Sequence, residues 1–302
     1  MDTYPAPARP LVEALQAAAA ANPANTIAFQ GAPGANSHIA VAQAFPGGIA
    51  LPCFSFEDAI EAVQSGAAAR AMIPIENSLH GRVADIHFLL PESGLVITQE
   101  HFLPIRYALM GTGTLADVKQ AISHPQALGQ CRHWLRSRGI APLSYPDTAG
   151  AAARAIELGD PSVAAIAPPL AAQTYGLSIL ADGLEDSDDN MTRFVILARA
   201  GDPARHEGQD ESIVMTTLIF EVKNVPAALY KAMGGFATNG VNMTKLESYQ
   251  RGASFAATTF FADIEGDPHD PAVARALDEL QYHSKSVRLL GTYPQSRPRT
   301  VG

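Results

Sequence analysis

A strand-to-helix pattern that recurs before residue 200 most constrains how this chain can fold. Four short apolar runs are each followed by a turn and a helix-compatible segment: Thr26–Phe29, Ala71–Ile75, Val118–Ile122 and Val163–Ala167. Strands joined through helices favour parallel sheets covered by helices, because a parallel connection is long enough to hold a helix. The pattern therefore predicts an α/β region.

Small polar residues follow the first three of these strands. They are Asn36 and Ser37, then Asn77 and Ser78, then Ser123, His124 and Gln126. Helix N-termini expose unpaired N–H groups that attract anions, and ligands of open α/β sheets bind where the carboxyl ends of strands converge. Ser and Asn also cap helices in any α/β protein, so each residue alone has that simpler interpretation. Three such sets together predict an anion-binding cleft.

The stretch Asp186–Phe194 carries the strongest chemical signal. Its first half is acidic and turn-prone, and it places Asn190, Thr192 and Arg193 directly before a strand that is expected from Val195. An amide, a hydroxyl and a permanent cation can together hold an oxygen-rich anion without a metal or cofactor. The alternative for Arg193 is that it only neutralises the acidic residues before it.

Composition and spacing exclude several functions. The net charge of −9 without a basic run argues against a nucleic-acid partner, and no stretch approaches the roughly 18 apolar residues of a membrane span. The nine histidines and the carboxylates show no metal-ligand spacing, and neither GxGxxG nor GxxxxGK[ST] is present. We therefore expect no metal and no cofactor. Cys53 and Cys131 have the apolar neighbours of small core residues, as in a reducing cytoplasm.

The chain is expected to divide into several parts. Residues 1–24 form an N-terminal extension with a short helix over about Leu11–Ala21, and prolines and acidic residues interrupt the apolar core that a signal peptide needs, which favours a cytoplasmic location. Residues 25–199 are expected to form two lobes, with the chain crossing between them near 97–110 and 192–198. The polar segment 200–212 is typical of a linker.

Residues 213–293 are expected to form the elements β-α-β-β-α-β in this order, and a tail follows at 294–302. The expected strands are Ile213–Val222, Val241–Ser248, Ser254–Ile264 and Val287–Leu290. One expected helix begins at Pro226 and ends at Asn239-Gly240, and the other follows Asp270. This order predicts a ferredoxin-like domain.

Four ordered motifs resemble those of prephenate dehydratases that carry a C-terminal ACT regulatory domain. The motifs are Gly31 with Pro33-Gly34 and Ser37; Pro74-Ile75-Glu76-Asn77-Ser78 with Gly81 and Val83; Ser123-His124-Pro125-Gln126-Ala127-Leu128 with Gln130-Cys131; and Asn190 with Thr192-Arg193-Phe194. The resemblance implies a two-lobed, periplasmic-binding-protein-like (type II) catalytic region followed by a ferredoxin-like ACT domain.

The resemblance also implies the reaction. Prephenate loses its ring carboxylate as CO2 and its 4-hydroxyl as water, which gives phenylpyruvate for phenylalanine biosynthesis without a cofactor. Thr192 matches the family's catalytic threonine and is expected to donate a hydrogen bond to the departing hydroxyl. Substrate contacts are expected from Ser37, Asn77, Ser78, Gln126, Asn190, Arg193 and Phe194.

The ACT part of the resemblance implies L-phenylalanine as an effector and a homodimer or homotetramer that forms through the ACT domains. The expected effector residues are Asn224, Ala228, Leu229, Glu247 and Ser248. The family's Gly-Ala-Leu motif appears here with Ala227 in place of glycine, which crowds a backbone approach. Two alternatives stay open: an arogenate dehydratase, and an amino-acid sensor that has lost catalysis.

Overall fold

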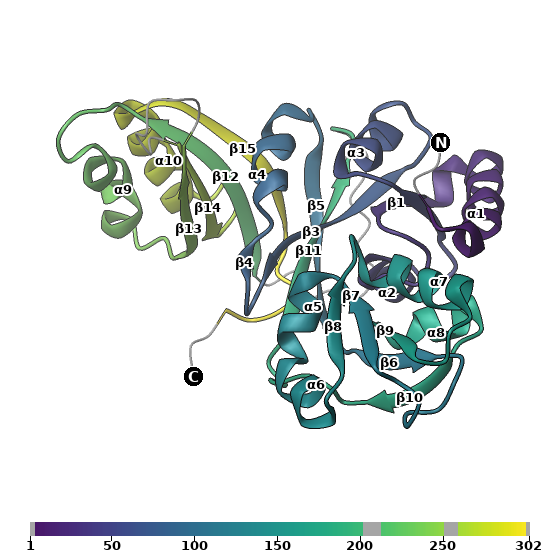
Figure 1. The fold of residues 1–302 in the computed structure, drawn as a ribbon. Helices are drawn as coiled ribbons and strands as arrows, with labels where there is room; N and C mark the ends of the chain where they lie inside the picture. The colour runs from purple at the N-terminus through teal and green to yellow at the C-terminus, as the bar shows by residue number, and fades with distance from the viewer. Residues whose placement is uncertain (1–3, 202–212, 251–258, 300–302) are drawn as a thin grey trace. The chain divides into compact units, whose positions relative to one another are not determined.

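The computed structural model describes residues 4–201, 213–250 and 259–299, and Figure 1 traces their helices and strands. The chain forms two compact units. One combines Met1–Ile86 with His101–Phe194, and the other combines His87–Glu100 with Val195–Gly302. Most of the expected linker at 200–212, and the start of the strand expected over Ser254–Ile264, lie outside the described residues.

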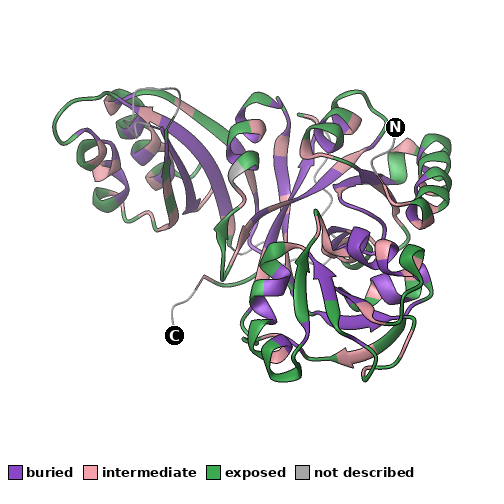
Figure 2. Cartoon of the chain, in the orientation of Figure 1, coloured by how far each residue is buried: buried purple, intermediate pink, exposed green. Residues whose placement is uncertain are grey.

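The first mixed sheet has the strand order β2-β1-β3-β11-β5, with the two-residue β4 paired to β3. Its strands are β1 (Thr26–Gln30), β2 (Ile49–Cys53), β3 (Arg70–Asn77), β4 (Gly81–Arg82), β5 (Val96–Pro104) and β11 (Met191–Ala198). Strand β1 runs parallel to β2 and β3, and α2 (Asn36–Ala44) and α3 (Phe56–Gln64) pack on them. Figure 2 shows these central strands as largely buried.

The second sheet repeats this plan with the order β10-β6-β9-β7-β8. Its strands are β6 (Ala108–Gly111), β7 (Gln120–Ser123), β8 (Ala141–Ser144), β9 (Val163–Ala167) and β10 (Ser178–Asp182). Strand β7 is parallel to β8 and β9, whereas β6 is antiparallel to β9. The accompanying helices are α5 (Pro125–Gln130), α6 (Arg132–Arg138), α7 (Thr148–Leu158) and α8 (Pro169–Tyr175). Each sheet with its helices is one lobe, as the sequence predicts.

The N-terminal segment belongs to both lobes. The helix α1 (Arg9–Ala21) packs on β2 of the first lobe, and the short 3₁₀ helix Ala6–Ala8 packs on α7 of the second. Ala8 is fully buried among the small residues of α7 and its neighbours. The segment is therefore part of the folded two-lobed region, where the sequence predicted an extension with a helix.

One local prediction was wrong. The polar residues after β3 do not begin a helix, because the chain turns at Ser78–His80 into the hairpin strand β4, and α4 (Ala84–Glu92) starts only afterwards. The Asn77 side chain accepts hydrogen bonds from the backbone N–H groups of Leu79 and His80, which stabilises this turn. A turn of this kind competes with helix formation at the same residues.

The chain also returns to the first lobe earlier than expected. Strand β10 belongs to the second sheet and β11 to the first, so the crossing lies in the segment 183–190 and not along 192–198. The acidic turn thus connects the lobes, and β11 begins at once with the residues of interest.

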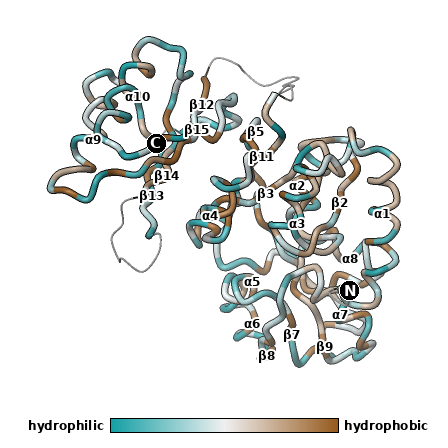
Figure 3. Tube along the Cα trace, turned by 90° about the horizontal axis from the view of Figure 1, so that it is seen from above, coloured by the Kyte–Doolittle hydropathy of each residue, from teal (hydrophilic) through white to brown (hydrophobic). Residues whose placement is uncertain are grey.

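The C-terminal strands form a separate antiparallel sheet in the order β13-β14-β12-β15. Its elements are β12 (Val214–Val222), α9 (Ala228–Thr238), β13 (Met243–Tyr249), β14 (Thr259–Glu265), α10 (Pro271–His283) and β15 (Ser284–Pro294). Apolar side chains of β12 and β14 pack against α9 and α10, and Figure 3 shows β12 mostly in the hydrophobic colour. This is the predicted ferredoxin-like arrangement. No helix in the described ranges is long and apolar enough to span a bilayer.

Candidate active site

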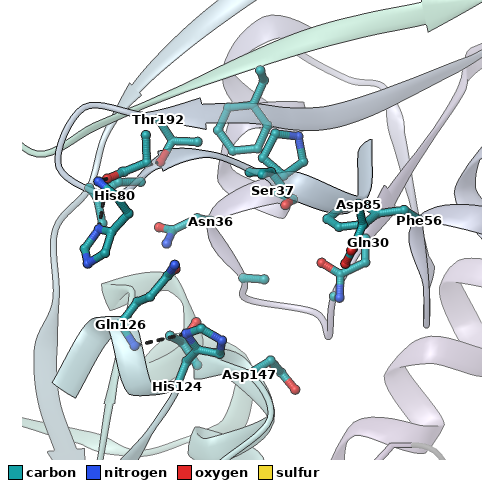
Figure 4. A pocket seen from close by; sticks show the side chains of 18 of the residues that line it. Gln30, Asn36, Ser37, Phe56, His80, Asp85, His124, Gln126, Asp147 and Thr192 are labelled. Atoms are coloured by element: carbon teal, nitrogen blue, oxygen red, sulfur yellow. Dashed lines mark hydrogen bonds between the residues drawn. The ribbon is translucent and has the colours of Figure 1, made fainter. Parts of the chain in front are cut away.

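A cavity of about 570 Å³ lies in the unit that contains both lobes. This volume falls within the roughly 300–1,000 Å³ of small-molecule sites. The first lobe lines it with the β1–α2 turn, the β3–β4 hairpin and β11, and the second lobe with the starts of α5 and α7. Figure 4 shows Thr192 and His80 on one side of the pocket, and His124 and Asp147 on the other.

The hydroxyl of Thr192 lines the cavity near the start of β11 and is held by an amide. Asn77 Nδ2 donates to Thr192 Oγ1 over 3.0 Å. A hydroxyl that already accepts one hydrogen bond has its own O–H free to donate elsewhere. Thr192 can therefore offer a donor to a ligand in the cavity.

Three further side chains fix the amide of Asn77 in this orientation. Asn77 Nδ2 lies 2.7 Å from Asn190 Oδ1, and Asn190 Nδ2 donates to Gln130 Oε1 over 2.6 Å. Gln130 Nε2 lies 3.0 Å from His80 Nδ1. His80 Nδ1 also lies 3.1 Å from Asn77 Oδ1, so the imidazole contacts both Gln130 and Asn77. Residues 113 positions apart in the sequence thus meet in one network.

The alternation of β11 separates the predicted site residues. Thr192 and Phe194 line the cavity, whereas Arg193 points to the opposite face of the strand, where its side chain is 3% exposed and pairs with Glu76 over 2.9 Å. Arg193 does not line the cavity, and it forms an ion pair with Glu76.

Ser78 and Asn190 also lie behind the cavity wall and do not line it. Ser78 Oγ donates to the carbonyl of Asp189 and accepts from the N–H of Met191. These two bonds tie the hairpin to the start of β11, so Ser78 positions the strand that carries Thr192. Of the predicted substrate contacts, those on the cavity surface are Ser37, Asn77, Gln126 and Phe194, and the predicted catalytic residue Thr192 also lines it.

The acidic turn before β11 binds to protein groups outside the cavity. Asp186 accepts from the backbone N–H of His133, and Asp188, 94% exposed, pairs with Arg106. Neither aspartate lines the cavity.

The second side of the cavity carries titratable groups. His124 Nδ1 accepts the N–H of Gln126 over 3.2 Å, which leaves its proton on Nε2. Burial lowers the pKa of His124, and the nearby Asp147 opposes this effect. Burial raises the pKa of Asp147, against hydrogen bonds from the backbone N–H groups of Gly150 and Ala149.

The N-terminal segment packs behind the side of the cavity that contains Asp147. The ring of Tyr4 packs against Ala32, Ala35 and Ala149, which join the β1–α2 turn of one lobe to the start of α7 in the other. The Tyr4 hydroxyl is buried without a hydrogen-bond partner among the described residues, and burial raises its pKa strongly, with Asp147 among the charges that add to the effect. The wall that holds Asp147 is thus shielded from water from behind.

Cationic side chains are scarce around the cavity. Within the described ranges its lining contains one arginine, Arg82, and no lysine, together with the acidic Asp85 and Asp147. An anionic ligand would therefore depend mainly on neutral hydrogen-bond donors. Ser37, Asn36 and Gln126 supply such groups from the starts of α2 and α5.

A comparison with known proteins identifies the family. The family model described as prephenate dehydratase matches residues 27–202. The chain belongs to the prephenate dehydratase family. A bifunctional N-acyl-homoserine lactone acylase/prephenate dehydratase from Komagataeibacter europaeus is 49% identical over 272 residues, which cover 89% of this chain and 96% of that protein.

Two further relatives extend this comparison. Arogenate dehydratase/prephenate dehydratase 1 of Arabidopsis thaliana, a chloroplastic protein, is 36% identical over 90% of this chain and 73% of its own length. The crystal structure of prephenate dehydratase from Arthrobacter aurescens in complex with L-Phe has a TM-score of 0.80 at 31% identity, covering 92% of this chain and 93% of that one. The predicted fold is confirmed: a two-lobed periplasmic-binding-protein-like (type II) region and a ferredoxin-like domain.

Sequence reasoning missed several residues that the structure brings to this dehydratase-family cavity. His80 and Gln130 lie beside or within the quoted motifs, but no role was predicted for them; His124 was predicted as part of the cleft, but not as a titratable group of its wall. Tyr107 and Asp147 had no signal, because each is placed by a turn between elements whose packing the sequence does not show.

The residues expected to bind an effector lie on two elements of the other unit. Asn224 is exposed before α9, Ala228 and Leu229 lie in its first turn, and Glu247 and Ser248 lie on β13. Ala227, where the family motif has glycine, adopts φ +60°, the left-handed region that glycine enters without strain.

Glu247 already has protein partners in this arrangement. Its carboxylate lies 3.3 Å from His87 Nε2 and 3.2 Å from Lys245 Nζ. His87 is 1% exposed and belongs to α4, the helix that follows the hairpin lining the cavity. Within this unit, β13 therefore contacts α4 through Glu247 and His87.

Proposed function

We propose that the chain is a prephenate dehydratase. The bond between the ring C1 and its carboxylate breaks, and CO2 leaves. The electron pair moves through the ring diene and expels the 4-hydroxyl, which takes a proton and leaves as water. Phenylpyruvate remains, and aromatisation of the ring makes the step favourable without a cofactor.

The observation that carries this proposal is the hydroxyl of Thr192 in the hydrogen-bond network of Asn77, Asn190 and Gln130. Its O–H is available to the departing hydroxyl, and the fixed amides keep it in place without reorganisation during the reaction. Threonine is a weak acid, so we assign it stabilisation of the leaving oxygen by hydrogen bonding. A positioned donor of this kind is worth about 100- to 1,000-fold in rate.

The substrate anion would be held by neutral groups. Ser37 and Asn36 at the start of α2 and Gln126 at the start of α5 face the cavity from the two lobes, and Arg82 is the cation of its rim. This assignment leaves out Arg193, which pairs with Glu76. Ser78 and Asn190 are assigned to positioning the hairpin and the amides.

The direct test is to mix the purified protein with prephenate and follow phenylpyruvate. Turnover supports the proposal. Tight binding of L-phenylalanine by calorimetry, without turnover of prephenate or arogenate, would overturn it in favour of an amino-acid sensor.

Feedback inhibition by L-phenylalanine belongs to the same proposal. Residues 213–293 would form an ACT regulatory domain, and two or four chains would associate through it. The contact between Glu247 and His87 supports a link to catalysis, because an effector that draws on the Glu247 carboxylate would change the packing of α4. L-Phenylalanine should lower prephenate turnover and favour the larger assembly; unchanged kinetics at saturating L-phenylalanine would contradict this part.

A second candidate activity is hydrolysis of the amide of N-acyl-homoserine lactones, which the name of the K. europaeus relative includes. The favouring observation is His124 near Asp147 in the cavity, because an imidazole supported by a carboxylate is a common base for activating water. Release of free homoserine lactone from an N-acyl substrate tests it, and an intact amide after prolonged incubation excludes it.

A further inference from the structure

Asp147 is an acidic side chain in a cavity otherwise suited to an anion, and the proposed reaction gives it no role. Asp147 lines the cavity at the start of α7, and the N–H of Gly150 donates to its Oδ1 over 2.7 Å. The other acidic lining residue, Asp85, is exposed. Asp147, which is half-buried, is therefore the less exposed of the two acidic groups of the pocket.

The position of Asp147 relative to Thr192 decides which part of a substrate it would meet. Figure 4 shows the two residues on opposite sides of the pocket, with Asn36 and Gln126 between them. In prephenate and arogenate the departing hydroxyl is on C4 and the three-carbon side chain is on C1, across the ring. A substrate with its hydroxyl at Thr192 therefore directs its side chain toward the side of Asp147.

The two substrates differ at one group of that side chain. Prephenate has a keto oxygen, which only accepts hydrogen bonds, and arogenate has an ammonium, which only donates. A half-buried carboxylate such as that of Asp147 is a strong partner for an ammonium and an unfavourable neighbour for a keto acid. The scarcity of cations around the cavity also favours arogenate, whose net charge is −1, over prephenate, whose net charge is −2.

We propose that Asp147 is a specificity-determining residue that pairs with the ammonium of arogenate, so that this pocket uses arogenate as well as prephenate. This rests on the proposed function of the cavity. The direction of the pKa shift of Asp147 is compatible with this pairing. Burial raises the pKa of its carboxyl, and a bound ammonium would lower it again by favouring the ionised form.

The simpler interpretation is that Asp147 only caps α7. Asparagine and serine cap helices about as well as aspartate, so Asp147→Asn and Asp147→Ser keep the cap and remove the charge. A pure capping role predicts that both variants treat the two substrates as the wild type does. Gly150 should stay unchanged in these variants, because a Cβ there would lie 2.4 Å from Asp147 Oδ2.

The experiment compares kcat/KM for arogenate and for prephenate in the wild type, Asp147→Asn and Asp147→Ser. Loss of a charged hydrogen bond is expected to lower the arogenate value by about 10- to 100-fold and to leave the prephenate value equal or higher. The ratio of the two values in one preparation is insensitive to the fraction of folded enzyme. Asp117→Asn, a fully exposed aspartate outside the cavity, is the matched control and should leave the ratio unchanged.

The outcomes distinguish failure of the proposed function from failure of the role of Asp147. If the wild type turns over neither substrate, the proposed function fails. If it turns over prephenate and not arogenate, or if it turns over both and the Asp147 variants keep the wild-type ratio, the role of Asp147 fails and the dehydratase stands. A ratio that moves with Asp85→Asn and not with Asp147→Asn would also overturn it, because the exposed carboxylate would then be the determinant.

Discussion

The two sides of the cavity are built from different chemistry. One side, here called the amide wall, consists of Asn77, Gln130 and Thr192, with Asn190 bonded to both amides from behind. The other, here called the acid–base wall, contains His124 and Asp147. Amides do not titrate and each supplies both donors and acceptors, so the amide wall can hold one hydroxyl in one orientation at any pH. The acid–base wall can change its charge with its ligand.

This difference assigns the two walls to different parts of catalysis. A donor aimed at a leaving group must be in place before the reaction, because reorganisation during the step would cost rate. Recognition of the substrate side chain benefits instead from a charge that responds to the group it meets. The comparison predicts that changes in the amide wall alter kcat, and that changes in the acid–base wall alter specificity and pH dependence.

The largest expected effect comes from removing the hydroxyl of the amide wall. Thr192→Ala should lower kcat for prephenate by roughly 100- to 1,000-fold, since it deletes the donor to the departing hydroxyl. KM should change less, because the hydroxyl acts mainly in the transition state. Steady-state kinetics of phenylpyruvate formation measure both.

Thr192→Ser keeps the hydroxyl and should retain most of this rate. Thr112→Ala removes an exposed threonine outside the cavity and is the control for the substitution itself. If Thr192→Ala kept more than about a tenth of wild-type kcat, the amide wall would not hold the catalytic donor.

A smaller effect is expected from a residue that supports the amide wall without touching the cavity. Asn190 is 1% exposed, and Asn190→Ala removes the acceptor for Asn77 and the donor to Gln130. We expect kcat to fall by roughly tenfold at nearly constant KM, and the free energy of unfolding to fall by about 1 to 3 kcal/mol, since buried polar groups lose their partners.

Denaturant unfolding and kinetics on the same preparation check both expectations. Asn242→Ala, which removes an exposed asparagine outside the cavity, is the matched control. A parallel rise in KM would indicate that Asn190 contacts the substrate, contrary to its position behind the wall.

The two walls also differ in how far the sequence predicts them. Asn77, Asn190 and Thr192 were identified because amides and a hydroxyl at strand ends indicate anion chemistry. Their network was not predictable, because it depends on the hairpin at Ser78–His80 and on the pairing of β3 beside β11. Arg193 shows the same limit: the sequence indicates a cation near the site, and only the register of β11 shows that it points to Glu76.

Very little of the acid–base wall followed from the sequence. His124 lies in a quoted motif, but its desolvation results from packing between lobes that sequence patterns do not specify. Asp147 was not singled out in the sequence, and the packing around it involves Tyr4, far away in the sequence, against Ala149. The alternation of elements predicted both folds because hydrophobic periodicity is local, whereas the cavity depends on long-range contacts.

The smallest expected effect is on the pH dependence of the free energy of unfolding, and it tests His124 of the acid–base wall in the ligand-free protein. Burial lowers the pKa of His124 below its unfolded value of 6.5. Between the folded and unfolded pKa values the unfolded chain binds more protons, so stability rises with pH through this window and is constant above it. As pH falls below 6.5, this contribution is lost. His124→Gln removes the titration and should give a shallower loss of stability between pH 7 and pH 5.

The difference should stay below about 1 kcal/mol, because His124 is only half-buried and solvent screens its charge. Thermal or denaturant unfolding measured at several pH values detects it as a change of slope. His38 and His101, whose pKa values burial also lowers, remain in the variant and contribute the same slope to both proteins.

The amide wall provides the contrasting control, because Asn190→Ala should lower the whole stability curve without changing its slope. If His124→Gln kept the wild-type slope, the pocket would not hold this imidazole neutral. The titratable character of the second wall would then depend on Asp147 alone. In that case the pH dependence of substrate choice should disappear in Asp147→Asn and persist in His124→Gln, which the kinetics of the two variants would distinguish.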